Sequence, residues 1–497
     1  MSTADRTPGG SEGTRVVVVG GGVAGLVVAW ELTRVGLRPT VLEAGPAVGG
    51  TVARHSVGGL VLDAGAESYA NATPSVPELL TDLGLGADLV LPNPVGAWVR
   101  HVAGTAPLPQ ATVLGIPSRP LAADVRRVLG PVGAARALLD HWLPSRIGAG
   151  AGTLGGLVGV RMGRSVVTRL VEPVAGGVYS TDPDELDVDA VQPRLRKALR
   201  DSGSLAAAVG LLRASAARPG SAVGGLSGGL HRMVQALADG ITAAGGSVRS
   251  GTAVDSVRRT AGGWELAAGN GPLTADQVVL AGPGPAAAPL LADVGVTVPA
   301  AAADTSDVLL VTLVLDAPGL DAHPRGTGIL VSRWATGVTA KALTHATAKW
   351  AWLAETAGPG RHVLRLSYGR GGGNLPGTGL VQTAIADAAT LTGVPLTAGA
   401  LVDSDVVRWS SALPRPQAGH RVAMDAVRAE VARIGGLHLT GSVVAGTGLA
   451  AVVADARKVA AAVAAESLPP DSSAADVGQD TSRPGPSPRP AGGRWNA

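Results

Sequence analysis

The sequence predicts an α/β fold in which one domain, built on a buried parallel sheet, is interleaved with a second domain of mixed α+β structure. Three neighbouring segments near the start of the chain predict the sheet. Arg15–Val19 is rich in β-branched residues, as is typical of a strand buried on both faces, and Pro39–Glu43 has the composition of a second strand. Between them lie a glycine-rich turn and Leu26–Val35, whose apolar residues have helical spacing. A strand, a turn, a helix and a second strand in this order open a parallel sheet.

Further pieces of the sheet domain occur far along the chain. Gly246–Val257 and Gln277–Ala281 are predicted as short strands, and Leu437–Thr440 as a strand that leads into the helix Ala450–Ala464. Between these pieces lie two long segments richer in Pro, Arg and Trp, which we assign to the second domain. The predicted division is a disordered leader at 1–13; the sheet domain at 14–90, 224–299 and 401–467; the second domain at 91–223, mainly helical, and at 300–400; and a disordered tail at 468–497.

Composition excludes several classes of protein. Hydrophobic residues make up 46% of the chain and charged residues 16%, which excludes a disordered protein. No segment has the length of a membrane-spanning helix or the pattern of a signal peptide, so we expect a cytoplasmic protein, with contact to a membrane surface left open. The net charge of +3, without a polybasic run, argues against a nucleic-acid partner. The chain has no Cys, and His345, His362 and His420 lack ligand spacing, so we expect no metal and a cofactor for any redox chemistry.

The glycine-rich turn has the pattern G-x-G-x-x-G at Gly20, Gly22 and Gly25. In a Rossmann-like domain the first glycine takes the tight turn, the second lets the backbone approach a pyrophosphate, and the helix N-terminus attracts the phosphates. Glu43, at the end of the next strand, is placed to accept hydrogen bonds from a ribose. A glycine-rich surface loop is the alternative, and the turn by itself does not separate FAD from NAD. The predicted cofactor-binding residues of the turn are Gly20, Gly21, Gly22, Val23, Ala24 and Gly25.

The residues after the second strand resemble the flavin amine oxidase superfamily. The resemblance rests on Ala44, the paired glycines Gly49 and Gly50, and the stretch D-x-G-A-E-S at Asp63–Ser68. In that superfamily the paired glycines carry the chain past the pyrophosphate toward the isoalloxazine, so the resemblance implies FAD. The basic residues expected around the pair are replaced by Ala47 and Thr51, which leaves the phosphates to backbone amides. The residues that the resemblance assigns to the cofactor here are Ala44, Gly49, Gly50, Gly65, Ala66, Glu67 and Ser68.

Longer motifs resemble the oxygen-dependent protoporphyrinogen and coproporphyrinogen III oxidases of haem biosynthesis over most of the chain. The most specific are DAGAESYAN at 63–71, VEPVAGGVY at 171–179 and VRWSSALP at 407–414, with the glycines of Gly441–Leu449. The stretch Val443–Ala445 departs from the acidic or aromatic residue usual there. The resemblance implies flavin contacts at Val254, Trp409, Thr447, Gly448 and Leu449.

The resemblance implies FAD-dependent oxidation of coproporphyrinogen III to coproporphyrin III by oxygen, with hydrogen peroxide released in each of three rounds of hydride removal. Arg100 is the leading candidate for holding substrate carboxylates, because a guanidinium group pairs with them in a fork. No catalytic acid or base, and no oligomeric state, is predicted. Coproporphyrinogen is preferred because the low lysine content is typical of a GC-rich bacterial genome and no membrane segment is found. Protoporphyrinogen IX oxidation, a flavin amine oxidase or desaturase activity, and an inactive flavin-binding relative are the alternatives.

Overall fold

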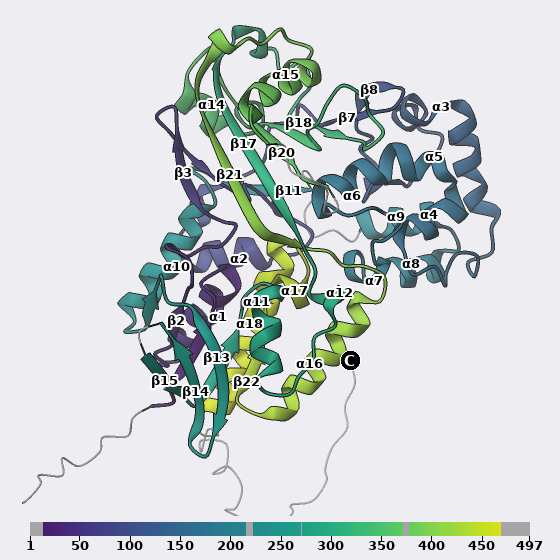
Figure 1. Cartoon of the computed structure of the whole chain (residues 1–497). Helices are drawn as coiled ribbons and strands as arrows, with labels where there is room; N and C mark the ends of the chain where they lie inside the picture. Colours follow the sequence, from purple (N-terminus) through teal and green to yellow (C-terminus); the bar gives the residue numbers. More distant parts are fainter. Residues whose placement is uncertain (1–12, 215–221, 270, 371–376, 469–497) are drawn as a thin grey trace, which may run out of the picture.

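The computed structural model describes residues 13–214, 222–269, 271–370 and 377–468. Apart from Gly13 and Leu468, the predicted leader and tail lie outside the described residues. The described chain forms two lobes, and the start of the chain (purple) lies beside its end (yellow) in the lower lobe of Figure 1. Two long strands, β17 (Thr305–Asp316) and β21 (Leu401–Pro414), run from the upper lobe down to the lower one.

The lower lobe is built on a five-stranded parallel sheet, which confirms the predicted α/β class. Its first strand is buried from both sides, since Val18 packs into one hydrophobic cluster and Val17 into another. Val16 to Val19 pair in parallel with strands on either side. The strand order is β12 (Ser247–Arg249), β2 (Thr40–Leu42), β1 (Val16–Val19), β16 (Gln277–Leu280) and β22 (Leu437–Leu439).

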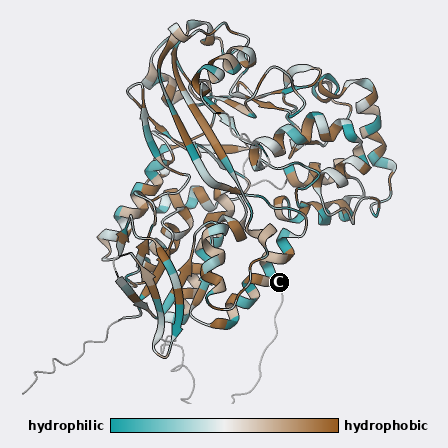
Figure 2. Ribbon diagram, viewed as in Figure 1, coloured by the Kyte–Doolittle hydropathy of each residue, from teal (hydrophilic) through white to brown (hydrophobic). Residues whose placement is uncertain are grey.

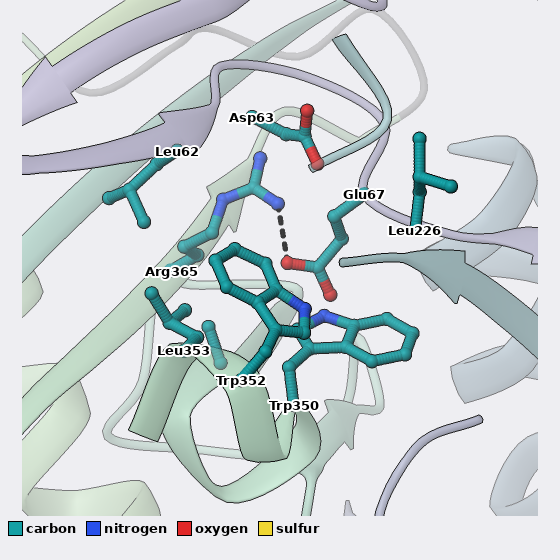
Figure 3. Close-up of a pocket in the computed structure, with 9 residues that line it drawn as sticks. Leu62, Asp63, Glu67, Leu226, Trp350, Trp352, Leu353 and Arg365 are labelled. Atoms are coloured by element: carbon teal, nitrogen blue, oxygen red, sulfur yellow. Dashed lines mark hydrogen bonds and ion pairs between the residues drawn. The ribbon is translucent and has the colours of Figure 1, made fainter. Parts of the chain in front are cut away.

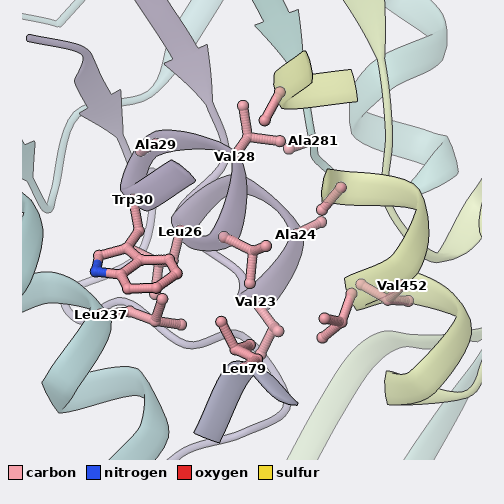
Figure 4. Packing of buried hydrophobic residues seen from close by; sticks show 14 of the residues in the cluster. Val23, Ala24, Leu26, Val28, Ala29, Trp30, Leu79, Leu237, Ala281 and Val452 are labelled. Carbon is pink, nitrogen blue, oxygen red and sulfur yellow. The ribbon is translucent and has the colours of Figure 1, made fainter. Parts of the chain in front are cut away.

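Two layers cover this sheet. On one face, helix α1 (Val23–Arg34) packs against α18 (Leu449–Ser467) and α10 (His231–Ala243), and Figure 4 shows their interlocked side chains around Leu26 and Val28. The other face is covered by the following elements: the antiparallel strands β13 (Val254–Thr260), β14 (Gly263–Ala268) and β15 (Gly271–Ala275), and the helices α11 (Gly284–Ala292), α12 (Ala300–Ala303), α16 (His420–Ile434) and α17 (Ser442–Ala445).

The upper lobe is built on a seven-stranded sheet. Helix α15 (Leu380–Thr392) covers one of its faces. Strand β21 pairs with β17 from Leu401 to Pro414, so the predicted domain boundary at 400 is wrong at this point, and residues 401–414 belong to the upper sheet. The strand order is β21, β17, β20 (Arg361–Tyr368), β19 (Ala342–His345), β18 (Gly328–Val331), β7 (Trp98–His101) and β8 (Gly104–Pro107).

A helical part adjoins the edge strands β7 and β8. Its core is a continuous hydrophobic cluster that includes Val99 and Ala106 from these strands. Figure 2 shows its helices alternating hydrophobic (brown) and hydrophilic (teal) residues, as expected where one side of each helix packs inward. The main helices are α3 (Ala123–Leu138), α4 (Leu154–Met162), α5 (Arg164–Val166), α6 (Glu172–Tyr179), α7 (Val188–Val191), α8 (Leu195–Ser202) and α9 (Leu205–Ala214).

Short elements join the lobes. The strand β11 (Val223–Leu226) pairs with β5 (Tyr69–Ala70) and β6 (Leu89–Val90). The strands β3 (Arg54–Val57) and β4 (Leu60–Asp63) form a hairpin, and β3 contacts β17 and β21. The remaining short elements are β9 (Thr112–Val113), β10 (Ile116–Pro117), α2 (Ser75–Asp82), α13 (Ala346–Lys349) and α14 (Ala351–Ala357). Within the described residues, no helix is both long enough and apolar enough to cross a bilayer.

Candidate functional site: a cavity between the two lobes

A cavity of about 500 Å³ lies where the long strands of the upper lobe meet the lower sheet. One wall is formed by the segments that follow β1, β16 and β22, so the cavity opens at the carboxyl ends of the parallel strands. Open α/β sheets bind ligands at this edge. The opposite wall is formed by β17, with Val308 and Leu310, and by the end of β21 from Trp409 to Pro414.

The three motif glycines of the turn have different tasks. Gly20 adopts a φ of +108°, which side-chain-bearing residues rarely take. A Cβ on Gly25 would lie 2.0 Å from the carbonyl oxygen of Gly20, so this position needs glycine for packing. A Cβ on Gly22 would meet no atom of the described residues within 4 Å, and Gly22 lines the cavity. Gly22 is therefore the glycine that leaves room for a ligand.

The N-terminus of α1 points its free amides at this space. Gly22 is the N-cap in an extended conformation, and within the described residues no side chain caps the helix and its first turn carries no acidic residue. The first amides of a helix lack intrahelical partners and carry the positive end of its dipole. Together with the open space at Gly22, they form a site for an anion such as a pyrophosphate.

Glu43 lines the cavity beside the turn, at the end of β2. Its Oε2 accepts a hydrogen bond from the Gly21 amide at 2.7 Å, and its Oε1 accepts one from the Gly45 amide at 2.7 Å. These bonds fix the carboxylate and brace the turn, while each oxygen keeps further acceptor capacity for a ribose hydroxyl. The sequence predicted that Glu43 binds a ribose, but it gave no indication that Glu43 also holds the turn through these two hydrogen bonds.

The paired glycines lie directly against the turn. The Gly49 amide donates to the Gly21 carbonyl at 2.8 Å, and Gly49 and Gly50 have φ values of +113° and +57°. Gly65 follows in the same wall, where a Cβ would lie 1.9 Å from the carbonyl oxygen of Thr51. Thr51 lines the cavity at a position where the resemblance led us to expect a basic side chain. Phosphates bound here would therefore depend on backbone amides.

At the far end of the cavity, Trp409 ties the upper strand to the lower lobe. Its indole Nε1 donates to the carbonyl oxygen of Ala64 at 3.0 Å, which holds the segment carrying Gly65 and Ala66 against β21. Thr447 and Leu449, ahead of and within α18, complete this end. The sequence-predicted residues that the structure gathers in the cavity wall are Gly20, Gly22, Val23, Ala24, Glu43, Gly49, Gly50, Gly65, Ala66, Trp409, Thr447 and Leu449.

Other predicted residues do not line the cavity. Gly21 faces Glu43 and Val48, and Gly25 packs against the Gly20 carbonyl. Ala44 and Gly448 are exposed and do not line the cavity. Val254 begins β13, where it pairs with the neighbouring strand β14. Arg100 lies in β7, several strands away across the upper sheet, and its Nη2 donates to the carbonyl oxygen of Thr336 at 3.0 Å. The structure does not bring Arg100 to this cavity.

Glu67 and Ser68 do not line the cavity and instead contact Lys349. Glu67 belongs to an ion-pair cluster, whose pair with Arg365 is shown in Figure 3. Glu67 accepts from Lys349 Nζ at 2.8 Å and from Arg365 Nη1 at 2.7 Å. Burial alone would raise the pKa of Glu67, but the two cations outweigh burial and lower the pKa to about 2. Arg365 also donates to the carbonyl oxygen of Gly65 at 2.6 Å, so the cluster braces the cavity wall from behind.

Sequence reasoning missed Lys349 and Arg365. The signal was present, since Arg365 interrupts the apolar strand VLRLSY and Lys349 is one of four lysines in the chain. A charged residue inside an apolar strand needs a buried partner.

Within the described ranges, no group of His, Asp and Glu side chains is arranged to hold a metal ion.

Comparison with known proteins agrees with this geometry. The family model for flavin-containing amine oxidoreductases matches residues 23–465. A coproporphyrinogen III oxidase of Mycobacterium leprae is 30% identical over 90% of this chain and 98% of its own length, and that of Bacillus subtilis is 26% identical over 87% and 94%. A crystal structure described as a protoporphyrinogen oxidase from Exiguobacterium sp. 255-15 superposes with a TM-score of 0.78 at 28% identity, covering 92% of this chain and all of the other.

Proposed function

This chain belongs to the flavin-containing amine oxidoreductase family, in the group that includes bacterial coproporphyrinogen III oxidases, and from that premise we propose that it is an FAD-dependent coproporphyrinogen III oxidase. The reaction converts coproporphyrinogen III to coproporphyrin III in haem biosynthesis, with oxygen as acceptor and hydrogen peroxide as second product. The observation that carries the proposal is the single cavity of about 500 Å³ that runs from the glycine turn to Trp409. Such a cavity would accept a pyrophosphate and a ribose as well as a flavin ring, which supports FAD over a mononucleotide.

The residues of the cavity divide the binding of FAD among them. The amides at the start of α1 would hold the pyrophosphate and Glu43 the ribose. Gly65, Ala66, Trp409 and Leu449 would enclose the ring. When bound, the flavin supplies the hydride acceptor of the reaction and the link to oxygen.

The chain itself contributes orientation and exclusion of water. The wall formed by Val308 and Leu310 is apolar, and hydrogen bonds from Trp409 and Arg365 hold the facing segment in place. A rigid, water-poor cavity favours the transfer because the reacting groups need no reorganisation when they meet. Protoporphyrinogen IX is the second candidate substrate, supported by the similarity to the Exiguobacterium protein.

The proposal is tested on the purified protein in three steps. The absorption spectrum and mass of the released cofactor should identify FAD. Under anaerobic conditions, coproporphyrinogen III should bleach the bound flavin. In air, the fluorescence of the porphyrin products reports the rate of oxidation. The kcat/KM for coproporphyrinogen III should be higher than the kcat/KM for protoporphyrinogen IX.

Each failure has a distinct meaning. Absence of flavin would refute the cofactor assignment. Bound flavin without bleaching by either porphyrinogen would favour the inactive relative. Bleaching by an alkylamine instead would favour an amine oxidase. A higher kcat/KM with protoporphyrinogen IX would replace the proposed substrate.

A further inference from the structure

A second cavity, of about 340 Å³, lies between helix α6 and the ends of the strands β18 and β20. Ser180, which follows α6, lines it together with Arg333, which follows β18, and Arg370, which follows β20. Figure 1 shows α6 beside these strands. The cavity therefore gathers two guanidinium groups and a hydroxyl from three separate segments, and its lining also includes the carboxylates of Glu172, Asp182 and Glu185.

This cavity is connected to the proposed flavin site by residues that line the space between them. Tyr179, the neighbour of Ser180, lines a small pocket together with Pro414 and Thr447. The same Pro414 and Thr447 line the flavin cavity. A substrate that reaches the flavin can thus place a peripheral group near the end of α6.

A buried lysine stands behind the wall of the second cavity. Lys341 precedes β19 and is 1% exposed, held by backbone hydrogen bonds to Ser367 and Val331. Its ammonium Nζ donates to Ser180 Oγ, which lines the cavity. Ser180 is the C-cap of α6 and has a φ of +53°, the left-handed conformation in which many helices end, and this turn places its hydroxyl at Lys341.

The charge of Lys341 has no counter-ion among the described residues. Two carboxylates that line the same cavity are paired with its arginines: Glu172 accepts from Arg370 Nη1 at 3.2 Å and from the Arg333 amide at 3.1 Å, and Asp182 pairs with the Arg333 guanidinium. Burial, and secondarily the nearby charge of Arg370, lowers the pKa of Lys341 to about 7. An ammonium group buried without a carboxylate destabilises a fold. An anion in the cavity would favour the charged form of Lys341, so the geometry points to a negative charge that arrives with a ligand.

The rim of the cavity does not supply that charge. Glu185 also lines the cavity, but it is 53% exposed and pairs with Arg415 at 3.2 Å. Arg415 in turn pairs with Asp304 at 3.0 Å. The uncompensated positive charge is therefore at the buried end, at Lys341 and Ser180.

We infer that the second cavity binds a carboxylate of the substrate, with Ser180 as the contacting hydroxyl, Arg333 and Arg370 as flanking cations and Lys341 as the buried charge that the carboxylate neutralises. The carboxylate is a propionate of coproporphyrinogen III, and this identification rests on the proposed function. Arg100, the candidate from sequence, has no part in this site. The site fixes one edge of the macrocycle and so orients it toward the flavin.

The test compares Lys341→Met, which keeps the length of the side chain and removes its charge, with Lys341→Arg and with the control Lys197→Met. Lys197 is 73% exposed and pairs with Asp201 on the surface. Binding of the product coproporphyrin III is measured by fluorescence titration, and kcat and KM are measured with coproporphyrinogen III and with its uncharged tetramethyl ester. The melting temperature and flavin content are recorded for each variant.

For Lys341→Met we expect a Kd for coproporphyrin III and a KM for coproporphyrinogen III that rise about 10- to 100-fold, as for the loss of one charge-assisted bond. The ester should be unaffected, the flavin content unchanged and the melting temperature equal or higher. Lys341→Arg should retain part of the binding, and Lys197→Met should behave as wild type. A merely structural lysine would lower the melting temperature and leave the Kd unchanged.

The inference is overturned if Lys341→Met leaves both constants unchanged, weakens acid and ester equally, or fails to fold or to hold flavin. If the wild type binds coproporphyrin III in a Lys341-dependent way but does not oxidise the porphyrinogen, the proposed function fails and the carboxylate site stands. If the wild type does not bind coproporphyrin III at all, the carboxylate site is refuted.

Discussion

Replacing Gly22 with alanine separates ligand binding from folding. The added methyl group meets no atom within 4 Å in the part of the chain that the structure describes, and the backbone at Gly22, with φ −68° and ψ 177°, suits alanine. The flavin-free protein should therefore keep its stability to within about 1 kcal/mol. The methyl group stands where a pyrophosphate must approach the amides of α1. Loss of two amide–phosphate bonds, at about 1.5–3 kcal/mol each, weakens FAD binding about 10²- to 10⁴-fold.

The matched control is alanine at Gly25, in the same motif. There the Cβ would lie 2.0 Å from the carbonyl oxygen of Gly20, so α1 must shift away from β1. Overpacking of this kind costs about 1–3 kcal/mol or more. We expect Gly25→Ala to lower the melting temperature of the flavin-free protein. Gly22→Ala should leave that melting temperature unchanged.

The assay has two independent readouts. Titration of flavin-free protein with FAD, followed by quenching of flavin fluorescence, gives Kd, and circular dichroism gives the melting temperature. The reasoning fails if Gly22→Ala binds FAD as tightly as the wild type, or if the two variants lose stability to the same extent. Valine at position 22, a larger obstacle, should yield protein purified without flavin.

Three further outcomes are expected. Glu43→Gln turns one of two amide-accepting oxygens into a donor, so the Kd for FAD should rise tenfold or more; an unchanged Kd would place the ribose elsewhere. Glu67 has a pKa lowered from 4.5 to about 2, so it stabilises the folded flavin-free protein above pH 4.5, and its contribution, on the order of 3 kcal/mol, is lost as the pH falls toward 2. In the Glu67→Gln variant, the free energy of unfolding should depend less on pH in that window than in the wild type. The same pH dependence in both proteins would contradict the assignment of Lys349 and Arg365 as the partners of Glu67. Trp409→Phe removes one hydrogen bond worth about 1 kcal/mol and should shift the absorption of bound flavin, which a spectrum of the purified variant will show or exclude.

The local parts of the fold were predictable from the sequence. The strand at Val16–Val19 and the turn at Gly20 are local features, because β-branched residues favour buried strands and glycine alone tolerates the turn. Helix α1 begins at Val23, three residues before the predicted start, since the N-terminal turn of a helix carries no periodic signal of its own. The predicted helix Ala450–Ala464 is α18, which extends to Leu449–Ser467.

The sequence by itself therefore determined the α/β class, the turn that would hold a dinucleotide, and twelve of the residues that line its cavity. These features depend on contacts close together in the chain or on motifs of fixed spacing. Only the tertiary structure decided that β21 joins the upper sheet, that Glu67 turns away to Lys349 and Arg365, and that Lys341 is buried beside Ser180 with no counter-ion in the described part of the chain. Each of these depends on segments 86 residues or more apart, and the direction in which a charged side chain points is set by which partner can neutralise it there.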